Sequence, residues 1–412
     1  MEKEARKLTV RYAFLQSSYW MSQCAIYSFA AVFLKSKNFD NTQIGFVLSL
    51  AAVISIILQP IVASFADKTK KISLRYIVIT LMMIVMALAL ILFIMPDSFL
   101  LIAGIYVLIN ALQYTLNPLF NSLALEYLNI GVPMNYGLAR GIGSIAFAIM
   151  SYLLGILVNQ FGPNVLLTIF IITYVFVIIS AFTFKIKIPA NPSLKSNSNN
   201  LDNNNIATTE KVNENSDNAP SGIFTFFIKY KKFTLHLIGL SMIFYSHSVI
   251  NTYLINIIEK VGGNSTDMGI SLSIAAALEL PTMAVFIYLV RKIKCSTLLK
   301  TAAFFFCIKA GLAWLAPNVI TVHISMALQM LSFALYTPAS VYYVNAIIDE
   351  KDKVKGQSML GVATLGIAGT IANITGGSIL DKFGVSDMLF IGTIVTFIGF
   401  LIVLVSTENT EK

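Results

Sequence analysis

The sequence has little charge for its length. Only 12% of its 412 residues are Asp, Glu, Lys or Arg, and 57% are hydrophobic. Soluble globular domains carry about 25% charged residues, because water has to solvate their surface. The composition therefore excludes soluble enzymes and nucleic-acid-binding proteins, and it predicts an integral membrane protein.

Cysteine and histidine are also scarce, with three residues of each. Cys24, Cys295 and Cys307 lack the C-x-x-C spacing of a metal or redox site, and an odd number does not form a disulfide framework. The sequence offers no Ser/His, His/Asp or metal-ligand cluster at a helix end or loop. We therefore expect no metal, no cofactor and no enzymatic activity.

The sequence does contain a series of apolar stretches of about 20 residues, the length that crosses a hydrocarbon core of about 30 Å as a helix. Alternation typical of a membrane β-barrel is absent, so we predict an all-α membrane protein. Twelve transmembrane helices are expected at 9–34, 42–66, 75–95, 98–129, 138–159, 164–185, 232–258, 267–290, 297–316, 319–347, 356–380 and 386–406.

Lys and Arg gather in alternate connections between these spans, and this bias predicts the orientation. The side opposite the termini has only Lys35, Lys37, Lys260 and Lys382. Cytoplasmic loops hold the excess of Lys and Arg, so we place both termini in the cytoplasm of a bacterial-type plasma membrane. This topology accounts for the net charge of +9 without a nucleic-acid partner.

One long polar segment interrupts the series of spans. Residues 190–221 contain ten Asn and no aromatic residue, so they cannot bury enough apolar area to fold. We predict a disordered cytoplasmic linker at 186–231, between an N-terminal six-helix half at 1–185 and a C-terminal six-helix half at 232–412.

The two halves resemble each other at an offset of about 220 residues. Residues 41–45 match 265–269, and the pairs Pro60 and Pro281, Pro118 and Pro338, and Phe161-Gly162 and Phe383-Gly384 fall nearly in register. Two copies in the same orientation predict a pseudo-twofold axis along the membrane normal, with a cavity between the copies near the midplane.

With this repeat, the sequence resembles the major facilitator superfamily. The superfamily signature G-x-x-x-D-[RK]-x-G-[RK]-[RK] follows the second helix, where ASFADKTKKI keeps Asp67 and Lys68 but lacks both glycines. The resemblance implies the major facilitator fold, a gating role for Asp67 and Lys68, and alternating access by rocking of the two halves.

Parts of the chain also resemble the lactose permease and its oligosaccharide/proton symporter relatives. YGLARGIGSIAFA at 136–148 resembles their fifth helix and places Arg140 on a sugar-contacting arginine. SIAAALELPTMAVF at 273–286 resembles their eighth helix and places Glu279 on its carboxylate, and Lys309 falls where the ninth helix carries an arginine.

The chain departs from this branch elsewhere. Gln329 and Ser332 replace the proton-coupling histidine and glutamate of the tenth helix, and Phe147 aligns with a tryptophan that stacks on the sugar. The substrate chemistry of the lactose permease therefore does not transfer to this chain directly.

Four charged side chains of the predicted spans are candidates for function: Glu126, Arg140, Glu279 and Lys309. A charge at bilayer depth costs at least ~2.5 kcal/mol, so such residues face a cavity or a partner. Arg140 either binds substrate or pairs with Glu126. Glu279 is either a proton carrier or substrate ligand, or the permanent partner of Lys309. His247 either relays protons or packs.

Polar side chains recur at helical spacing on the first, fourth, seventh and tenth spans, so each set lies on one helix face. The candidates are Gln16, Tyr19, Gln23, Tyr27, Gln113, Asn117, Asn121, Tyr245, Asn256, Gln329 and Tyr336. In the superfamily these four helices line the central cavity, so we expect these residues, with Arg140 and Glu126, to bind substrate. The alternative is that they form hydrogen bonds between packed helices.

Amides, hydroxyls and tyrosine rings suit a neutral polyhydroxylated or heterocyclic solute. We therefore predict a secondary active transporter of a sugar, oligosaccharide or nucleoside, coupled to protons through Glu279, Lys309 and His247. An exporter of drugs or metabolites with the same fold and a non-transporting sensor are the alternatives. The expected partners are the solute, protons and membrane lipid, and a monomer is expected.

Overall fold

The computed structural model describes residues 2–69, 72–129, 134–185 and 222–409, without the side chains of residues 2–4, 67 and 129. These residues form helices and no strands. The first half contains α1 (Glu2–Gln23), the π-helix η1 (Cys24–Ser28), α2 (Ala30–Ser36), α3 (Asn41–Lys68), α4 (Leu74–Ile94), α5 (Phe99–Asn129), α6 (Tyr136–Phe161) and α7 (Val165–Thr183).

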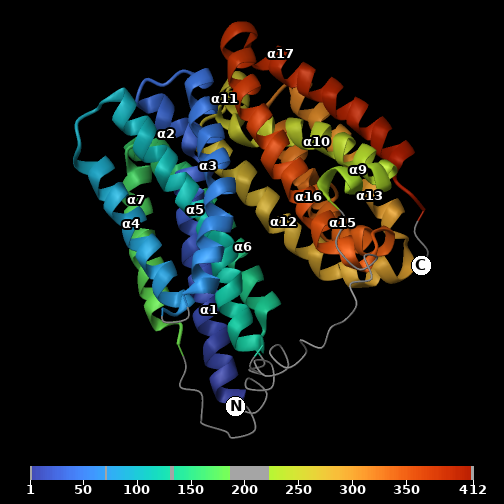
Figure 1. Ribbon diagram of the computed structural model, residues 1–412. Helices are drawn as coiled ribbons and strands as arrows, with labels where there is room; N and C mark the ends of the chain where they lie inside the picture. Colours follow the sequence, from blue (N-terminus) through green and yellow to red (C-terminus); the bar gives the residue numbers. More distant parts are fainter. Residues whose placement is uncertain (1, 70–71, 130–133, 186–221, 410–412) are drawn as a thin grey trace, which may run out of the picture.

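The second half begins with α9 (Ile223–Lys229) and α10 (Lys231–Thr252). Its remaining elements are α11 (Leu254–Lys260), α12 (Ser265–Lys292), α13 (Cys295–Trp314), α14 (Val319–Ala327), the 3₁₀-helix η2 (Leu328–Met330), α15 (Phe333–Ile347), the 3₁₀-helix η3 (Glu350–Asp352), α16 (Lys353–Gly361), the π-helix η4 (Val362–Ala368) and α17 (Gly369–Ser406). The two halves lie side by side, the first drawn in blue to green and the second in yellow to red (Figure 1).

The helices account for the twelve predicted spans. Within the described part of the chain, ten helices are long and apolar enough to cross a membrane. The last of these, Glu350–Ser406, turns at Gly384 (φ 85°, ψ 176°) and therefore makes two spans. The interrupted helix Glu2–Ser36 completes the set. The predicted all-α fold is confirmed.

The internal repeat is visible in local geometry. α3 and α12 each have 28 residues, each contain an internal proline, and each begin with a capping box, built by Asp40 with Gln43 and by Asn264 with Asp267. Gly162 (φ 81°) and Gly384 (φ 85°) both turn the chain into the last helix of their half. Their positive φ is open to glycine without a steric penalty, which explains the repeated Phe-Gly pair.

Several spans predicted as continuous helices are interrupted. The first contains η1, the seventh breaks at Tyr253 between α10 and α11, and the tenth contains η2. Polar side chains occupy these breaks and form tertiary contacts there: the Tyr253 hydroxyl donates to the Asn373 carbonyl over 2.6 Å. The pattern of hydrophobic residues predicted where these spans lie, but it did not predict where their helices are interrupted.

The start of the second half also differs from the predicted boundary. Residues 186–221 of the predicted linker lie outside the described residues, but α9 is helical before residue 232 and buries Phe226 completely. Lys229 Nζ donates to Asp349 Oδ2 over 2.5 Å and to Asp352 Oδ2 over 3.3 Å. The bond to Asp349 raises the pKa of Lys229, and the same bond lowers the pKa of Asp349.

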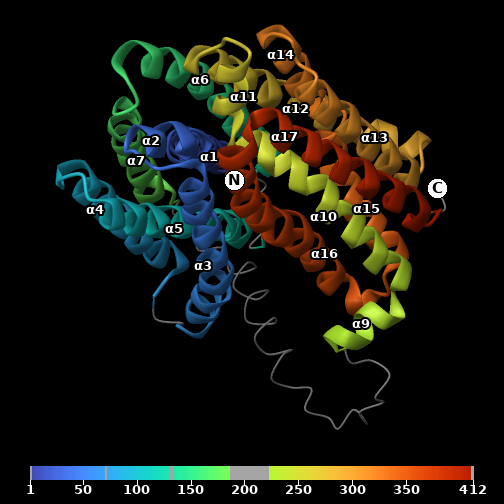
Figure 2. The same ribbon diagram turned by 90° about the horizontal axis from the view of Figure 1, so that it is seen from above.

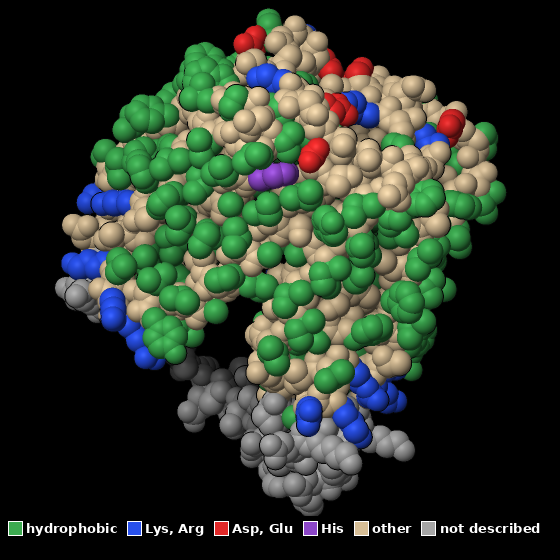
Figure 3. Space-filling view, turned by 180° about the vertical axis from the view of Figure 1, so that it is seen from behind, with side chains coloured by type: hydrophobic (Ala, Val, Ile, Leu, Met, Phe, Trp, Pro, Cys, Tyr) green, Lys and Arg blue, Asp and Glu red, His purple; other side chains and the backbone are tan. Residues whose placement is uncertain are grey.

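The halves meet through two helix pairs, α3 with α17 and α6 with α12 (Figure 2). We call the end of the bundle that carries the connections 37–40 and 261–264 the sealed face, and the end that carries the N-terminus and the α3–α4 connection the terminal face. The molecule is hollowed between its two lobes, and the hollow opens toward the terminal face (Figure 3).

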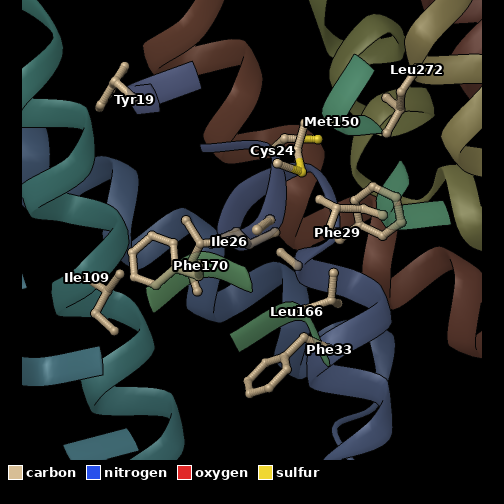
Figure 4. Packing of buried hydrophobic residues seen from close by; sticks show 14 of the residues in the cluster. Tyr19, Cys24, Ile26, Phe29, Phe33, Ile109, Met150, Leu166, Phe170 and Leu272 are labelled. Atoms are coloured by element: carbon tan, nitrogen blue, oxygen red, sulfur yellow. The ribbon is translucent and has the colours of Figure 1, made fainter. Parts of the chain in front are cut away.

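The sealed face has an apolar interior that both halves share. Phe29 and Phe33 of the first span pack with Leu166 and Phe170 of α7, and Leu272 of α12 joins the same buried cluster (Figure 4). Because this apolar cluster joins the two halves at the sealed face, a site between the halves is reached from the terminal face.

Candidate functional site

On the N-terminal half, Arg140 of α6 lies against an aromatic side chain of α1. Its guanidinium carbon is 5.0 Å from the centre of the Trp20 ring. The indole Nε1 of Trp20 donates to Gln16 Oε1 over 3.1 Å, and Gln16 Nε2 donates to the Tyr12 hydroxyl over 2.6 Å. Because Trp20 and Arg140 are only half-buried, the two side chains are available to a solute.

Asn121 of α5 extends this cluster. Its Oδ1 accepts from the Tyr12 hydroxyl over 3.3 Å and from the Tyr136 hydroxyl over 3.0 Å. The structure therefore brings together three predicted residues, Gln16, Asn121 and Arg140. It adds Tyr12, Trp20 and Tyr136, which we call, together with those three, the aromatic cluster.

Trp20 was missed by the sequence analysis. It follows Gln16 by four residues, a spacing that puts two side chains on neighbouring positions of one helix face, and this signal was present in the sequence. The predicted pair of Arg140 with Glu126 is not formed among the described residues: Arg140 faces Trp20, and Glu126 is exposed near the terminal end of α5.

On the C-terminal half, Gln329 joins two charges. Gln329 Nε2 donates to Glu279 Oε1 over 3.0 Å, and Lys309 Nζ donates to Gln329 Oε1. The permanent ion pair of Glu279 with Lys309 was one of two predicted alternatives. Among the described residues that pair is not direct, because the amide lies between its members. Lys309 is buried (1% exposed), whereas Glu279 is half-buried.

Gln329 is positioned by a break in its helix. It lies in η2, between α14 and α15, where Leu331 N and Ser332 N both bond to the Leu328 carbonyl. Ser332 has φ −96° and ψ −86°, outside the helical region. A 3₁₀ segment within a helix often marks a functional hinge, and the amide that contacts both charges lies on such a segment.

The two clusters face each other across the boundary between the halves. Gly141, next to Arg140, opposes Leu280, next to Glu279: a Cβ placed on Gly141 would be 3.8 Å from Leu280 Cδ2. The contact of α6 with α12 therefore brings the predicted substrate-contacting arginine and the predicted coupling carboxylate to one interface.

His247 lies in an aromatic surrounding on α10. Its ring stacks on Phe333 with centroids 5.3 Å apart and planes at 11°, and Phe244 and Phe306 approach within 5.6 and 5.4 Å. Tyr336 packs on Phe244 at 4.9 Å. His247 and Tyr336 are 8% and 6% exposed, so in this conformation both act as packing residues.

Other predicted residues are enclosed within the N-terminal half. Tyr19 is fully buried and donates to the Gln113 carbonyl over 2.8 Å. Gln113 is 0% and Gln23 is 5% exposed, so neither lines the hollow as expected. Tyr27 is the exception, because its ring packs on Tyr114 at 5.4 Å while the residue is 37% exposed. Helical spacing identified the face that Tyr19 and Gln23 share, but these two residues and Gln113 point into the half.

The three other predicted residues lie in different parts of the bundle. Asn117 is half-buried on α5. Tyr245 bonds within its own half, with its hydroxyl 3.0 Å from Thr375 Oγ1. Asn256 Nδ2 donates to Asn41 Oδ1 over 3.2 Å across the sealed face, so it closes the bundle in this conformation and does not line the hollow.

The gating signature lies at the terminal end of α3. Lys68 is the last residue of that helix and is exposed. The Asp67 side chain lies outside the described part of the chain, so the gating role of this pair stays a prediction.

Comparison with known proteins agrees with this architecture. A sequence model of the MFS_1 like family matches residues 11–391. The uncharacterized transporter YwbF of Bacillus subtilis (strain 168) is 24% identical over 366 residues, covering 89% of this chain and 85% of YwbF. Maltose permease of Geobacillus stearothermophilus is 22% identical over 390 residues, covering 93% and 91%.

Solved structures share the fold. The nucleoside transporter NupG superimposes with a TM-score of 0.73 at 14% identity, covering 98% of both chains. A bacterial homologue of the human lysosomal transporter Spinster, in an inward-facing and unoccupied conformation, gives a TM-score of 0.69 at 13% identity, covering 98% and 97%. The family match extends over most of the sequence, and the chain therefore belongs to the MFS_1 like family, as a multi-pass membrane protein and secondary transporter of the major facilitator superfamily.

Proposed function

We propose that the protein moves a neutral polyhydroxylated solute, a sugar, oligosaccharide or nucleoside, by alternating access coupled to protons, and that it is not an enzyme. The observation that carries this proposal is the juxtaposition of the Trp20–Arg140 pair with the Glu279–Gln329 pair across the boundary between the halves. Similarity to a maltose permease and to a nucleoside transporter supports the solute class.

The aromatic cluster has the chemistry of a sugar or nucleoside site. An indole ring covers the apolar face of a sugar or base, and a guanidinium donates a planar pair of hydrogen bonds to hydroxyl or carbonyl oxygens. Gln16 and Asn121 hold the rings from behind, because their amide oxygens accept from Trp20 and from Tyr12 and Tyr136. The site is therefore pre-organised by side chains that need not touch the solute.

Glu279 is the proposed proton carrier. When ionised, it accepts a hydrogen bond from Gln329 and is compensated by the charge of Lys309 through the same amide. Protonation removes the negative charge at bilayer depth, where a charge is costly. The protonated and ionised forms therefore favour different arrangements of α12 and η2, which is the requirement for coupling a proton to a conformational change.

The terminal face is proposed to be cytoplasmic, in a bacterial-type plasma membrane. Lys and Arg side chains gather at that end of both lobes, whereas the visible Asp and Glu lie toward the opposite end, together with a few Lys (Figure 3). This distribution follows the positive-inside rule. In this orientation the hollow opens to the cytoplasm, and we propose that the protein works as a monomer.

A binding screen tests the solute class. The chain has two tryptophans, so Trp314→Phe leaves Trp20 as the sole indole reporter. Sugars, oligosaccharides and nucleosides would be titrated against this variant, and binding should quench or shift its emission with saturation. Amphiphilic cations serve as the comparison set. Saturable binding of cations alone would favour a drug exporter and contradict the proposal.

A further inference from the structure

Asp381 of α17 crosses from the C-terminal half to the first turn of α3 in the N-terminal half. Its Oδ1 accepts from Asn41 N over 3.2 Å and from Asn41 Nδ2 over 2.7 Å. Its Oδ2 accepts from Thr42 N and from Thr42 Oγ1, both over 2.7 Å. Both oxygens of one carboxylate are therefore used between the halves, at the sealed face.

These contacts complete the cap of α3. The first N–H groups of a helix have no partner within it, and the helix dipole favours a negative charge there. Asp40 satisfies Gln43 N over 2.7 Å through its side chain and Ile44 N over 3.0 Å through its carbonyl. The two remaining N–H groups, those of Asn41 and Thr42, are satisfied by Asp381.

Backbone packing continues the seal below this carboxylate. A Cβ placed on Gly377 would be 2.1 Å from the Asn41 carbonyl oxygen, and one placed on Gly45 would be 1.9 Å from the Asn373 carbonyl oxygen. α3 and α17 are therefore in direct backbone contact, and a solute cannot pass between them while Asp381 holds the cap.

The repeat-related pair, α6 with α12, is sealed differently. A Cβ on Gly155 would be 2.6 Å from the Ser265 carbonyl oxygen, and a Cβ on Gly269 would be 2.4 Å from the Ser151 carbonyl oxygen. In the internal repeat, the offset that aligns Gly155 with Gly377 also aligns Asn159 with Asp381. Asn159 is an exposed residue with an uncharged amide. The carboxylate contact is thus present on one of the two helix pairs and is not a requirement of the repeated fold.

We propose that Asp381 is a gating residue of the transport cycle: its bonds to the first turn of α3 hold the sealed face closed, and they must break for that face to open. The inference rests on alternating access by this family. Opening separates α3 from α17 and returns the N–H groups of Asn41 and Thr42 to water. Asp381 therefore sets the ratio of the form open at the sealed face to the closed form.

Distance measurements between the halves test this role without any solute, so their outcome is separate from that of the proposed function. Spin labels would be placed at Ile94 and Leu315, exposed residues at the sealed ends of α4 and α13, in a variant lacking the native cysteines. Asp381→Asn keeps the side-chain shape and removes the charge. Asp387→Asn, on the same helix, is the matched control.

In Asp381→Asn the population with a longer distance between labels should rise about tenfold relative to the closed population, the effect of losing about one charge-assisted hydrogen bond. Asp387→Asn should match the parent. Thr42→Val, which removes only the hydroxyl contact, should shift the distribution in the same direction by less, and it replaces Asp381→Asn if that variant does not fold. If Asp381→Asn folds and its distance distribution equals the parent's, the proposal is overturned. If Asp381→Asn does not fold, an unchanged distribution in Thr42→Val overturns it.

Discussion

Gln329 donates a hydrogen bond to the Glu279 carboxylate over 3.0 Å, from an amide whose oxygen accepts from Lys309. A side-chain amide neither gains nor loses a proton at physiological pH. It therefore links the two charged groups by hydrogen bonds without itself becoming charged. Glu279 can therefore change protonation while Lys309 keeps a partner.

Removing this amide should destabilise the fold. Gln329→Leu leaves buried Lys309 without its hydrogen-bond acceptor, and a buried polar group left unsatisfied costs about 1–3 kcal/mol, or more when it is charged. We expect a clearly lower melting temperature in detergent. Ser340→Ala, which removes another buried polar group of the same span, is the control. Adding Glu279→Gln and Lys309→Met to Gln329→Leu should restore stability, and a Gln329→Leu variant as stable as the parent would exclude this arrangement.

Trp20 should contribute directly to solute binding. Trp20→Ala removes the ring over which Arg140 lies, and we expect the dissociation constant to rise about tenfold, the effect of one aromatic contact. Trp20→Phe keeps a ring but loses the bond to Gln16, so it should bind with intermediate affinity. Calorimetric titration measures both. Equal affinity in Trp20→Ala and the parent would place the solute elsewhere.

Glycine contacts should control which face is closed. Gly377→Ala places a methyl group against the Asn41 carbonyl, so the sealed face cannot close fully, whereas Gly104 has nothing within 4 Å of an added Cβ. Thiol labelling of Thr375→Cys by an impermeant reagent should become faster in Gly377→Ala and remain slow in Gly104→Ala. Equal labelling rates in these two variants would show that the contact does not limit closure.

The contact of α9 with the connection between α15 and α16 should depend on pH. Because the pKa of Asp349 is below its ordinary value of 3.8, its stabilising effect is present above that value and is lost as the pH falls through the lower, folded-state pKa. Lys229, whose pKa is raised, loses its effect only at strongly alkaline pH. The protection factors of the Ile223–Lys229 amides, which are corrected for the intrinsic pH dependence of hydrogen exchange, should therefore fall in acid. In Asp349→Asn these protection factors should already be lower at neutral pH, and protection equal to the parent's there would contradict this account.

The sequence was sufficient to predict the spans, the repeat and the four charged candidates, because length, apolar period and the cost of a charge in lipid are local properties of the chain. It could not show which helix faces which. Gln113 and Asn256 share the polar spacing of a cavity wall, yet one is enclosed within its half and the other crosses the sealed face. Trp20 and Arg140 meet only because α1 packs on α6.

The hydrophobic pattern of the sequence also could not predict the interruptions in the helices. The hydrophobic pattern around Gln329 is that of a continuous helix. In the structure the chain forms the 3₁₀-helix η2 there, and the Gln329 amide contacts Lys309 of α13 and Glu279 of α12. Asp381 appeared in no motif, since its partners at Asn41 and Thr42 are distant in sequence and belong to the other half. Such contacts follow from tertiary packing and from the conformation in which the halves rest.

Transport in proteoliposomes with an imposed pH gradient tests the coupling most directly, using a sugar or nucleoside that the binding screen identifies. The parent protein should accumulate the solute against its gradient, whereas Glu279→Gln should exchange solute across the membrane but not accumulate it, because the amide mimics a permanently protonated carboxyl. Asp387→Asn, which changes an exposed carboxylate outside both clusters, should accumulate solute like the parent. Accumulation by Glu279→Gln at the parent's level would contradict the assignment of Glu279 as the proton carrier.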